Sequence, residues 1–293
     1  DATMKTLLLG SVSAAALLIA SPALAQSNTS TVNQTGLGAN ATVAQSGANS
    51  QSDIDQGGTS NVANVGQSSA NRSTSVVNQN AASTAGGDND AFVRQSDDNV
   101  SSSTPANTST IDQTGRFGNA RVIQAQRIGN GTNTSAITQS GTGANNADGS
   151  TADVEQYGHN SSSISQTGNR SNAIVRQGVD GTPVGGNSSS VSQDDDDTAY
   201  INQNNNPPAG SAGNYGGNGS IVSQGDGTNT ATINQDGLTS NSTVNQSGGA
   251  TATVNQNGED DFSNVQQAGA STATVTQDGS QDGFGNGNTS DIF

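Results

Sequence analysis

The chain of 293 residues has no cysteine and no tryptophan, and aromatic residues make up only 3% of it. Without cysteine it has neither a disulfide framework nor a thiolate metal site. Hydrophobic residues make up 28%, too little for an ordinary globular core. Composition alone is therefore typical of a disordered chain or of a Gln/Asn-rich, prion-like segment.

Positive charge is also scarce, because 8 lysine and arginine residues stand against 24 aspartate and glutamate residues, a net charge of −16. Binding to nucleic acid phosphates needs a basic surface, so we expect no nucleic acid partner. The one long apolar run, residues 6–20, is too short for a membrane-spanning helix, and no second such run follows. We therefore expect no membrane span.

That apolar run belongs to a predicted secretory signal peptide. Met4 and Lys5 precede it, and Ala23 and Ala25 after it form an Ala-x-Ala cleavage site. Residues 1–25 are thus predicted to be an N-terminal extension and a signal peptide that begins at Met4. The mature chain is predicted to begin at Gln26, and we expect a secreted, extracellular protein.

What the chain has in abundance is a repeat built on glutamine. Twenty of the 25 glutamines share one frame, in which the residue two places before is always Val or Ile and the residue four places before is always Ala or Ser. Random low complexity would not hold two positions in register so often, so the periodicity overrides the composition. The twenty are Gln34, Gln45, Gln56, Gln67, Gln79, Gln95, Gln113, Gln124, Gln139, Gln156, Gln166, Gln177, Gln193, Gln203, Gln224, Gln235, Gln246, Gln256, Gln267 and Gln277.

Positions −6, −4, −2 and 0 relative to each glutamine share one parity, so in an extended strand they point to one face. This period-two alternation, often closed by a Gly two places after the glutamine, predicts a strand of about seven residues for each unit. The predicted inner face carries Val32, Val43, Ile233, Val244, Val254 and Val275 at position −2, and Asn28 and Asn229 at position −6.

Successive frame glutamines are mostly 10 to 12 residues apart. Stacking every second strand in parallel gives a two-strand rung of about 22 residues, and hence about ten rungs. A unit with so thin an inner face cannot bury itself, but stacking brings identical residues against their copies. We therefore expect an all-β, cross-β solenoid over residues 26–279, with parallel in-register sheets, a narrow Val/Ile column, and Gln and Asn amides paired along the axis. Residues 280–293 are predicted to be a flexible tail.

This repeat resembles the curlin repeat, which pairs two strands through a Gln-x-Gly, an Asn, an Ala and a second Gln. Asn28-x-Ser30-x-Val32-x-Gln34-x-Gly36 leads into Ala41-x-Val43-x-Gln45, and Asn229-x-Ala231-x-Ile233-x-Gln235-x-Gly237 leads into Ser242-x-Val244-x-Gln246. The resemblance covers residues 28–279. It implies a structural subunit of a curli-like extracellular amyloid fibre of bacterial biofilms, with roles in surface adhesion and aggregation. It also implies self-polymerisation, a nucleator subunit and export through a dedicated outer-membrane secretion channel.

Candidate catalytic and metal-binding residues are few. His159, the only histidine, lies three residues after Gln156, where a turn is expected, and no spacing marks it as part of a catalytic triad. The acidic runs 194–197 and 259–261 could attract Ca²⁺, but neither matches an EF-hand or a glycine-rich calcium repeat. We interpret them as solvated turns that repel neighbouring chains, and expect no enzyme activity, no metal and no cofactor.

Two other functions remain open at this point. Five units carry a Thr-x-Thr pair on the outer face: Thr29/Thr31, Thr108/Thr110, Thr230/Thr232, Thr251/Thr253 and Thr272/Thr274. These pairs suggest a monomeric solenoid that acts as an adhesin or binds ice, although five of twenty units do not predict an unbroken array. Plain disorder is the third possibility.

Overall fold

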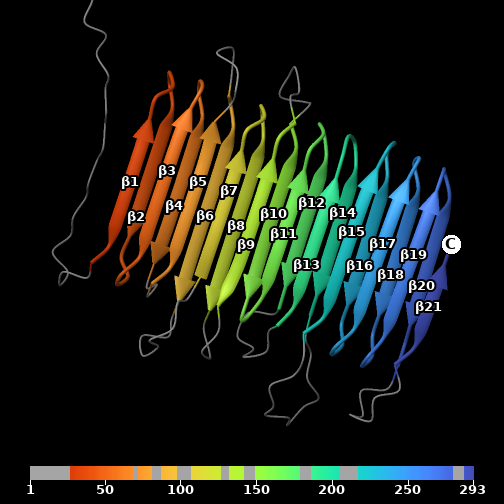
Figure 1. The fold of residues 1–293 in the computed structure, drawn as a ribbon. Helices are drawn as coiled ribbons and strands as arrows, with labels where there is room; N and C mark the ends of the chain where they lie inside the picture. The colour runs from red at the N-terminus through yellow and green to blue at the C-terminus, as the bar shows by residue number, and fades with distance from the viewer. Residues whose placement is uncertain are drawn as a thin grey trace, which may run out of the picture.

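The computed structural model describes residues 27–68, 72–80, 87–97, 107–126, 132–141, 149–178, 186–204, 217–279 and 287–293. The predicted N-terminal extension and signal peptide lie outside these residues. The described part of the chain is all-β, with no helix. Figure 1 shows a long, regular stack of strands that begins at β1 and ends at β21.

The strands form two parallel sheets, and the chain crosses from one sheet to the other at every turn. We call them the odd sheet and the even sheet, after the strand numbers. The odd sheet contains β1 (Thr29–Gln34), β3 (Gln51–Gly57), β5 (Thr74–Asn80), β7 (Asn107–Gln113), β9 (Asn133–Gln139), β11 (Ser161–Gln166), β13 (Ser188–Gln193), β15 (Gly219–Gly225), β17 (Asn241–Ser247), β19 (Phe262–Ala268) and β21 (Thr289–Ile292). The even sheet contains β2 (Asn40–Gln45), β4 (Val62–Ser68), β6 (Asp90–Asp97), β8 (Asn119–Gln126), β10 (Thr151–Tyr157), β12 (Asn172–Gln177), β14 (Thr198–Gln203), β16 (Thr230–Gln235), β18 (Thr251–Gln256) and β20 (Thr272–Gln277).

Each strand pairs in parallel with the strand two places away in the chain, and the pairing is in register. Between β16 and β18, for example, Ile233 lies beside Val254 and Gln235 beside Gln256. Each of the twenty predicted units forms one strand. The predicted all-β solenoid of stacked, in-register rungs is therefore confirmed.

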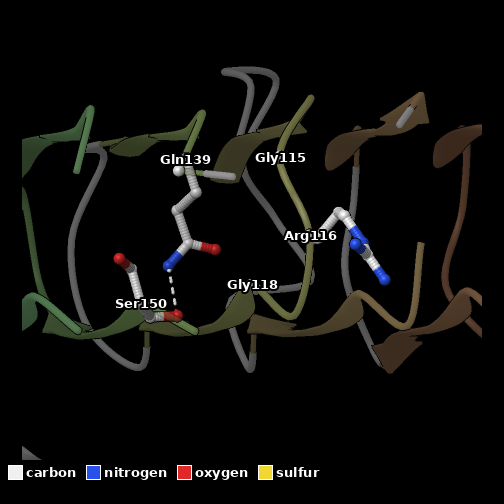
Figure 2. Close-up of a pocket in the computed structure, with 6 residues that line it drawn as sticks. Gly115, Arg116, Gly118, Gln139 and Ser150 are labelled. Atoms are coloured by element: carbon white, nitrogen blue, oxygen red, sulfur yellow. Dashed lines mark hydrogen bonds between the residues drawn. The ribbon is translucent and has the colours of Figure 1, made fainter. Parts of the chain in front are cut away.

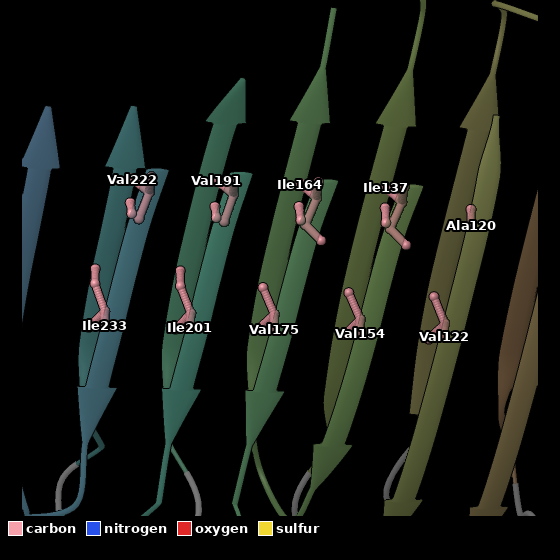
Figure 3. Close-up of a cluster of buried hydrophobic side chains, with 14 of the residues drawn as sticks. Ala120, Val122, Ile137, Val154, Ile164, Val175, Val191, Ile201, Val222 and Ile233 are labelled. Atoms are coloured by element: carbon pink, nitrogen blue, oxygen red, sulfur yellow. The ribbon is translucent and has the colours of Figure 1, made fainter. Parts of the chain in front are cut away.

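The core is a thin strip between the two sheets. Along β12 buried and half-buried residues alternate, and Ala173, Val175 and Gln177 are the buried ones. Except for Val32, the Val and Ile side chains at position −2 of both sheets form one continuous cluster, part of which Figure 3 shows as two stacked rows. Full burial of such a side chain stabilises a fold by about 1.5–3 kcal/mol, so the narrow column compensates for the low hydrophobic content.

The two sheets differ at position −4, a distinction that the sequence analysis did not draw. Every strand of the odd sheet has Ser there, including β21 with Ser290, whereas every strand of the even sheet has Ala. Stacking every second strand therefore places Ser beside Ser and Ala beside Ala, as in the pairs Ser162 with Ser189 and Ala231 with Ala252. Both residues are small, which lets the sheets approach closely.

The structure places a strand within residues 280–293, which the sequence predicts to be a flexible tail. β21 lies in this segment and pairs in parallel with β19, which places Ile292 beside Val265. Asn288, Ser290 and Ile292 occupy positions −6, −4 and −2 of the repeat. The glutamine frame does not predict this strand, because Gln277 is the last frame glutamine and the alternation continues beyond it.

Stacked turns explain the recurring Gly two places after glutamine. A Cβ added at Gly237 would overlap the backbone carbonyl oxygen of Gly258 in the next turn, and Gly36 stands in the same relation to Gly58. The requirement is for space, because neither Gly36 nor Gly237 has a positive φ. Any side chain here would push two rungs apart.

Neighbouring residues Val254 and Thr253 test which face of β18 is inside. Val254 is fully buried, whereas Thr253 points outward and is half-buried. We expect Val254→Asp to lower the free energy of unfolding by about 3–5 kcal/mol, because it buries an unpaired carboxylate. Thr253→Asp should lower it by about 1 kcal/mol or less, since its charge stays in water. Denaturant unfolding of the monomers, followed by circular dichroism, measures both; equal losses would mean that the strand faces are assigned wrongly.

Candidate functional site: two glutamine ladders

The frame glutamines lie in two continuous rows, one in each sheet. Each except the last of its row donates a hydrogen bond from Nε2 to Oε1 of its copy one rung on, at 2.7–3.0 Å. The odd row runs through Gln34, Gln56, Gln79, Gln113, Gln139, Gln166, Gln193, Gln224, Gln246 and Gln267. The even row runs through Gln45, Gln67, Gln95, Gln124, Gln156, Gln177, Gln203, Gln235, Gln256 and Gln277. The bond that explains the repeat, from each glutamine to its own copy, is thus present throughout both rows.

The ladders are polar. Every bond in both rows runs from the Nε2 of the earlier residue to the Oε1 of the later one, so all the side-chain amides point the same way along the axis. Aligned amide dipoles reinforce one another in chains of this kind. The first members, Gln34 and Gln45, therefore direct Oε1 toward one end of the solenoid. The last members, Gln267 and Gln277, direct Nε2 toward the other.

The side-chain amides of the ladder glutamines also form hydrogen bonds between the two sheets, which the repeat pattern did not predict. In most ladder glutamines Nε2 also donates to the backbone carbonyl at position −5 of the preceding strand, as Gln166 does to Thr151 at 2.9 Å. Many reach a second carbonyl just before the following strand. Figure 2 shows Gln139 of the odd sheet donating to the Ser150 carbonyl, 2.9 Å away, where the chain enters β10. Glutamine is long enough to bond along one sheet and across to the other.

These amides are buried, so their bonding matters for stability. Gln56, Gln67, Gln113, Gln139, Gln166, Gln235, Gln246, Gln256 and Gln277 are all at most 5% exposed, whereas Gln34 and Gln45 at the first rung are half-buried. A satisfied hydrogen bond adds only about 0.5–1.5 kcal/mol, but a buried amide left without a partner costs about 1–3 kcal/mol. Each ladder member therefore holds both of its neighbours in place.

The predicted pairing of asparagine amides at position −6 is wrong for most rungs. Asn28 Oδ1 accepts from the Ser50 backbone N–H at 2.9 Å, and Asn229 Oδ1 accepts from the backbone of Ala250 at 3.0 Å. Their Nδ2 groups donate to turn carbonyls, such as Gly47 for Asn28 at 2.7 Å. Each of these side chains instead joins successive turns through the backbone. An exception is the 3.0 Å amide bond from Asn133 to Asn107.

The valines and isoleucines of the predicted site lie beside the ladders. Ile233, Val244, Val254 and Val275 are buried, Val43 is half-buried, and Val32 in the edge strand β1 is 43% exposed. Val32 therefore presents apolar surface at the end of the stack where Gln34 points its Oε1.

Two rungs place a carboxylate where most others have asparagine or serine. Asp197 and Asp261 both occupy position −6 and are buried. Asp197 Oδ1 accepts from the backbone N–H and from Nδ2 of Asn229, each at 3.0 Å. Burial raises the pKa of Asp197, and its hydrogen bonds with Asn229 only partly oppose the shift. The Asp197 carboxylate thus accepts the hydrogen bonds that an Asn side-chain oxygen accepts elsewhere, but its burial removes water from a charged group.

The remaining candidates from the sequence are His159 and the acidic turns. His159 lies in the turn between β10 and β11, and burial lowers its pKa. Within the described ranges, no group of three or more His, Cys, Asp or Glu side chains could hold a metal ion. In the acidic turn 194–197, Asp196 pairs with Arg170, whose hydrogen bond lowers the pKa of Asp196. The void lined by Gly115, Gln139 and Ser150 has no room for a ligand of substrate size.

The threonine pairs are more continuous than the sequence predicted. Thr230/Thr232, Thr251/Thr253 and Thr272/Thr274 lie on β16, β18 and β20, which are neighbours in the even sheet, and the pairs are aligned in register. Tyr200 beside Thr232 interrupts the row at position −3. The other two pairs lie on β1 and β7 of the odd sheet.

No family model matches the chain, and no curated protein matches it. The described strands and turns include no helix long and apolar enough to cross a membrane.

Replacing one interior ladder glutamine should weaken the fold far more than replacing an exterior one. Gln246 accepts from Gln224 and donates to Gln267, both at 3.0 Å, whereas Gln266 is exposed and points outward. We expect Gln246→Leu to lower the free energy of unfolding by about 2–4 kcal/mol, because the neighbours lose partners. Gln266→Leu should change it by about 0.5 kcal/mol or less. Equal effects in denaturant unfolding would show that the ladder does not stabilise the fold.

The raised pKa of Asp197 predicts a pH dependence. Because its pKa is raised, the folded state binds a proton on Asp197 more tightly than the unfolded state does. The contribution of Asp197 to the free energy of unfolding is therefore complete below the ordinary pKa of 3.8 and is lost as pH rises through the folded-state pKa. Asp197→Asn removes the titration. We expect the variant to gain stability relative to the natural chain as pH increases from about 3.8 upward. Thermal unfolding of both monomers between pH 3 and pH 7, which brackets the ordinary Asp pKa, measures this; a constant difference would contradict the assignment.

Proposed function

We propose that the chain is a secreted structural subunit of an extracellular, curli-like amyloid fibre that supports adhesion and aggregation in a bacterial biofilm. The observation that carries the proposal is the polarity of the two ladders. One end of the solenoid offers the amide oxygens of Gln34 and Gln45, and the other offers the amide nitrogens of Gln267 and Gln277. The two ends of two copies are therefore complementary.

The edges of the stack support the same proposal. Both sheets end in a strand whose outer backbone groups have no neighbouring strand among the described residues, at β1 and β2 on one side and β20 and β21 on the other. Natural proteins normally protect such edges against pairing with another chain. Here the edge strand β1 has the same in-register pattern as the interior strands, and Val32 is partly exposed. Addition of another copy would continue both the backbone ladder and the inner column.

The curlin-like repeat extends the proposal to partners. The fibre is a homopolymer of this chain, begun by a nucleator subunit and supplied through an outer-membrane secretion channel. The net charge of −16 is consistent with a chain that stays soluble until it meets a fibre end. The chain's own chemistry is structural, with no catalytic step.

A monomeric solenoid that binds ice or a surface is the second candidate. It is favoured by one observation, the three aligned threonine pairs on β16, β18 and β20. The patch spans three strands of the ten in the even sheet. The Gln ladders, in contrast, run through every strand of both sheets except β21, so the fibre has the broader structural support.

Fibre formation by the purified chain beginning at Gln26 tests the proposal. After concentration without seeds, we expect unbranched fibres in electron micrographs and a cross-β reflection near about 4.7 Å. A chain that remains a monomeric β-protein would overturn the fibre, and thermal hysteresis of that monomer would then support ice binding.

A matched pair of variants shows whether the fibre uses the ladders. Gln34 is the first member of the odd row, and Gln51 is an exposed glutamine on the outer face of β3. We expect Gln34→Leu to slow the elongation of seeded fibres markedly, because its Oε1 can no longer accept from the next copy. Gln51→Leu should elongate at the rate of the natural chain. Equal rates would mean that the fibre joins elsewhere.

A further inference from the structure

A groove of about 510 Å³ lies at the high-numbered end of the solenoid, lined by Thr274, Val275, Thr276, Gln277, Asp278, Asn288, Thr289 and Ser290. One side is the free edge of β20, and the other is the beginning of β21. It exists because the described strands begin and end in the odd sheet, which has eleven strands against ten in the even sheet. The odd sheet therefore extends one strand further, and a space the width of one strand remains beside β20.

We propose that this groove receives strand β1 of a second copy of the chain, and that successive copies in the fibre are related by a half-turn about its axis. This inference rests on the proposed fibre and specifies how its subunits join. The incoming β1 takes the place of the next even-sheet strand, although in its own molecule it begins the odd sheet. That exchange of sheets at each junction is what produces the half-turn.

The side chains of β1 match the groove in the register that every other pair of strands follows. The segment Thr29–Gln34 (TSTVNQ) would lie along Thr272–Gln277 (TATVTQ). Val32, which is 43% exposed in the isolated molecule, would stack on Val275. Gln34 Oε1 would accept from Gln277 Nε2, which continues the even ladder by one rung.

The cross-sheet bond of the ladder can also be completed. Most ladder glutamines donate to the carbonyl at position −5 of the preceding strand, as Gln277 does to Phe262 at 2.8 Å. For a strand that follows β21, that carbonyl belongs to Thr289, which lines the groove. The Gln34 amide of the second copy therefore has its two usual partners already in place.

The next strand of the incoming copy pairs with β21 at positions −4 and −2, although β21 has no glutamine to donate to Gln45. β2 would pair with β21, placing Val43 beside Ile292 and Ala41 beside Ser290. Ile292 and Ser290 are only half-buried in the isolated molecule, and Val43 is half-buried too. The junction thus covers inner-face residues that the single chain leaves partly open.

Joining without a half-turn loses contacts in both of its forms, although replacement of β21 would set Gln34 and Gln45 against Gln267 and Gln277. If β1 paired with β21, the groove beside β20 would stay empty and its backbone groups unpaired. If β1 instead replaced β21 on β19, the four-residue pairing of β21 would be lost. The bonds from the backbone N–H and Nδ2 of Asn288 to Asp261, at 2.9 and 3.1 Å, would be lost with it. The half-turn keeps every bond of the single chain.

Cysteine cross-linking distinguishes these junctions, because the chain has no cysteine of its own. Thr31, Thr42 and Thr274 are exposed and occupy the same outward position in β1, β2 and β20. In the half-turn junction Thr274 of one copy lies beside Thr31 of the next, about 4.8 Å away between neighbouring strands, within disulfide reach. If β1 replaced β21, Thr274 would lie beside Thr42 instead. The two test chains are therefore Thr31→Cys/Thr274→Cys and its matched control Thr42→Cys/Thr274→Cys.

Each variant is assembled under reducing conditions, checked for fibres by electron microscopy, oxidised, and run on a non-reducing denaturing gel. We expect the Thr31/Thr274 variant to shift from monomer to a ladder of covalent multimers, and the Thr42/Thr274 variant to stay monomeric. The reverse result, equal cross-linking of both, or fibres in which neither cross-links would each overturn the half-turn junction while leaving the fibre proposal intact. Failure of the natural chain to form fibres would overturn the fibre proposal itself, before any oxidation step.

Discussion

The buried side-chain amide of glutamine is the constraint on which the rest of the structure depends. A primary amide has one oxygen to accept with and two N–H groups to donate, and a water-free interior leaves none of them free without a penalty. The in-register stack satisfies them by letting each glutamine accept from one copy, donate to the next, and donate across to the opposite backbone. A shift of one residue would turn the whole row out to solvent, so the amides set the register that the thin hydrophobic column alone would hold weakly.

This arrangement makes the molecule quasi-one-dimensional. Each strand contacts the strands before and after it in its sheet, and the narrow Val/Ile column crosses between the sheets. Stability then accumulates rung by rung, which suits a chain that has 28% hydrophobic residues. The same property leaves strand edges at both ends that resemble a cut through the stack, with the amides pointing in opposite senses. A structure of this kind has no internal reason to stop at the length of one chain.

The two faces of the solenoid nevertheless differ. The outer face of the even sheet carries Arg121, Asp153 and Arg176 in ion pairs on neighbouring strands. The outer face of the odd sheet is rich in serine, as in β11 and β13, where Ser161, Ser163 and Ser165 stack on further serines. Inside, the Ser column of the odd sheet includes buried hydroxyls without a hydrogen-bond partner, among them those of Ser52, Ser162 and Ser242. A half-turn between copies would alternate these faces along both sides of a fibre.

The sequence by itself determined the strands, their inner and outer faces and their register, because each depends on a local period of two and on identical residues meeting their copies. Val254 and Gln235 could be placed inside from spacing alone. Tertiary structure decided which groups meet in space: the Asn28 side-chain oxygen at position −6 accepts from a backbone N–H of the next rung, whereas the Gln139 side chain crosses to the opposite sheet. It also decided that Asn288, Ser290 and Ile292 form a twenty-first strand. That strand carries no glutamine. Its alternating residues are recognised as part of the repeat only because they pair in register with β19.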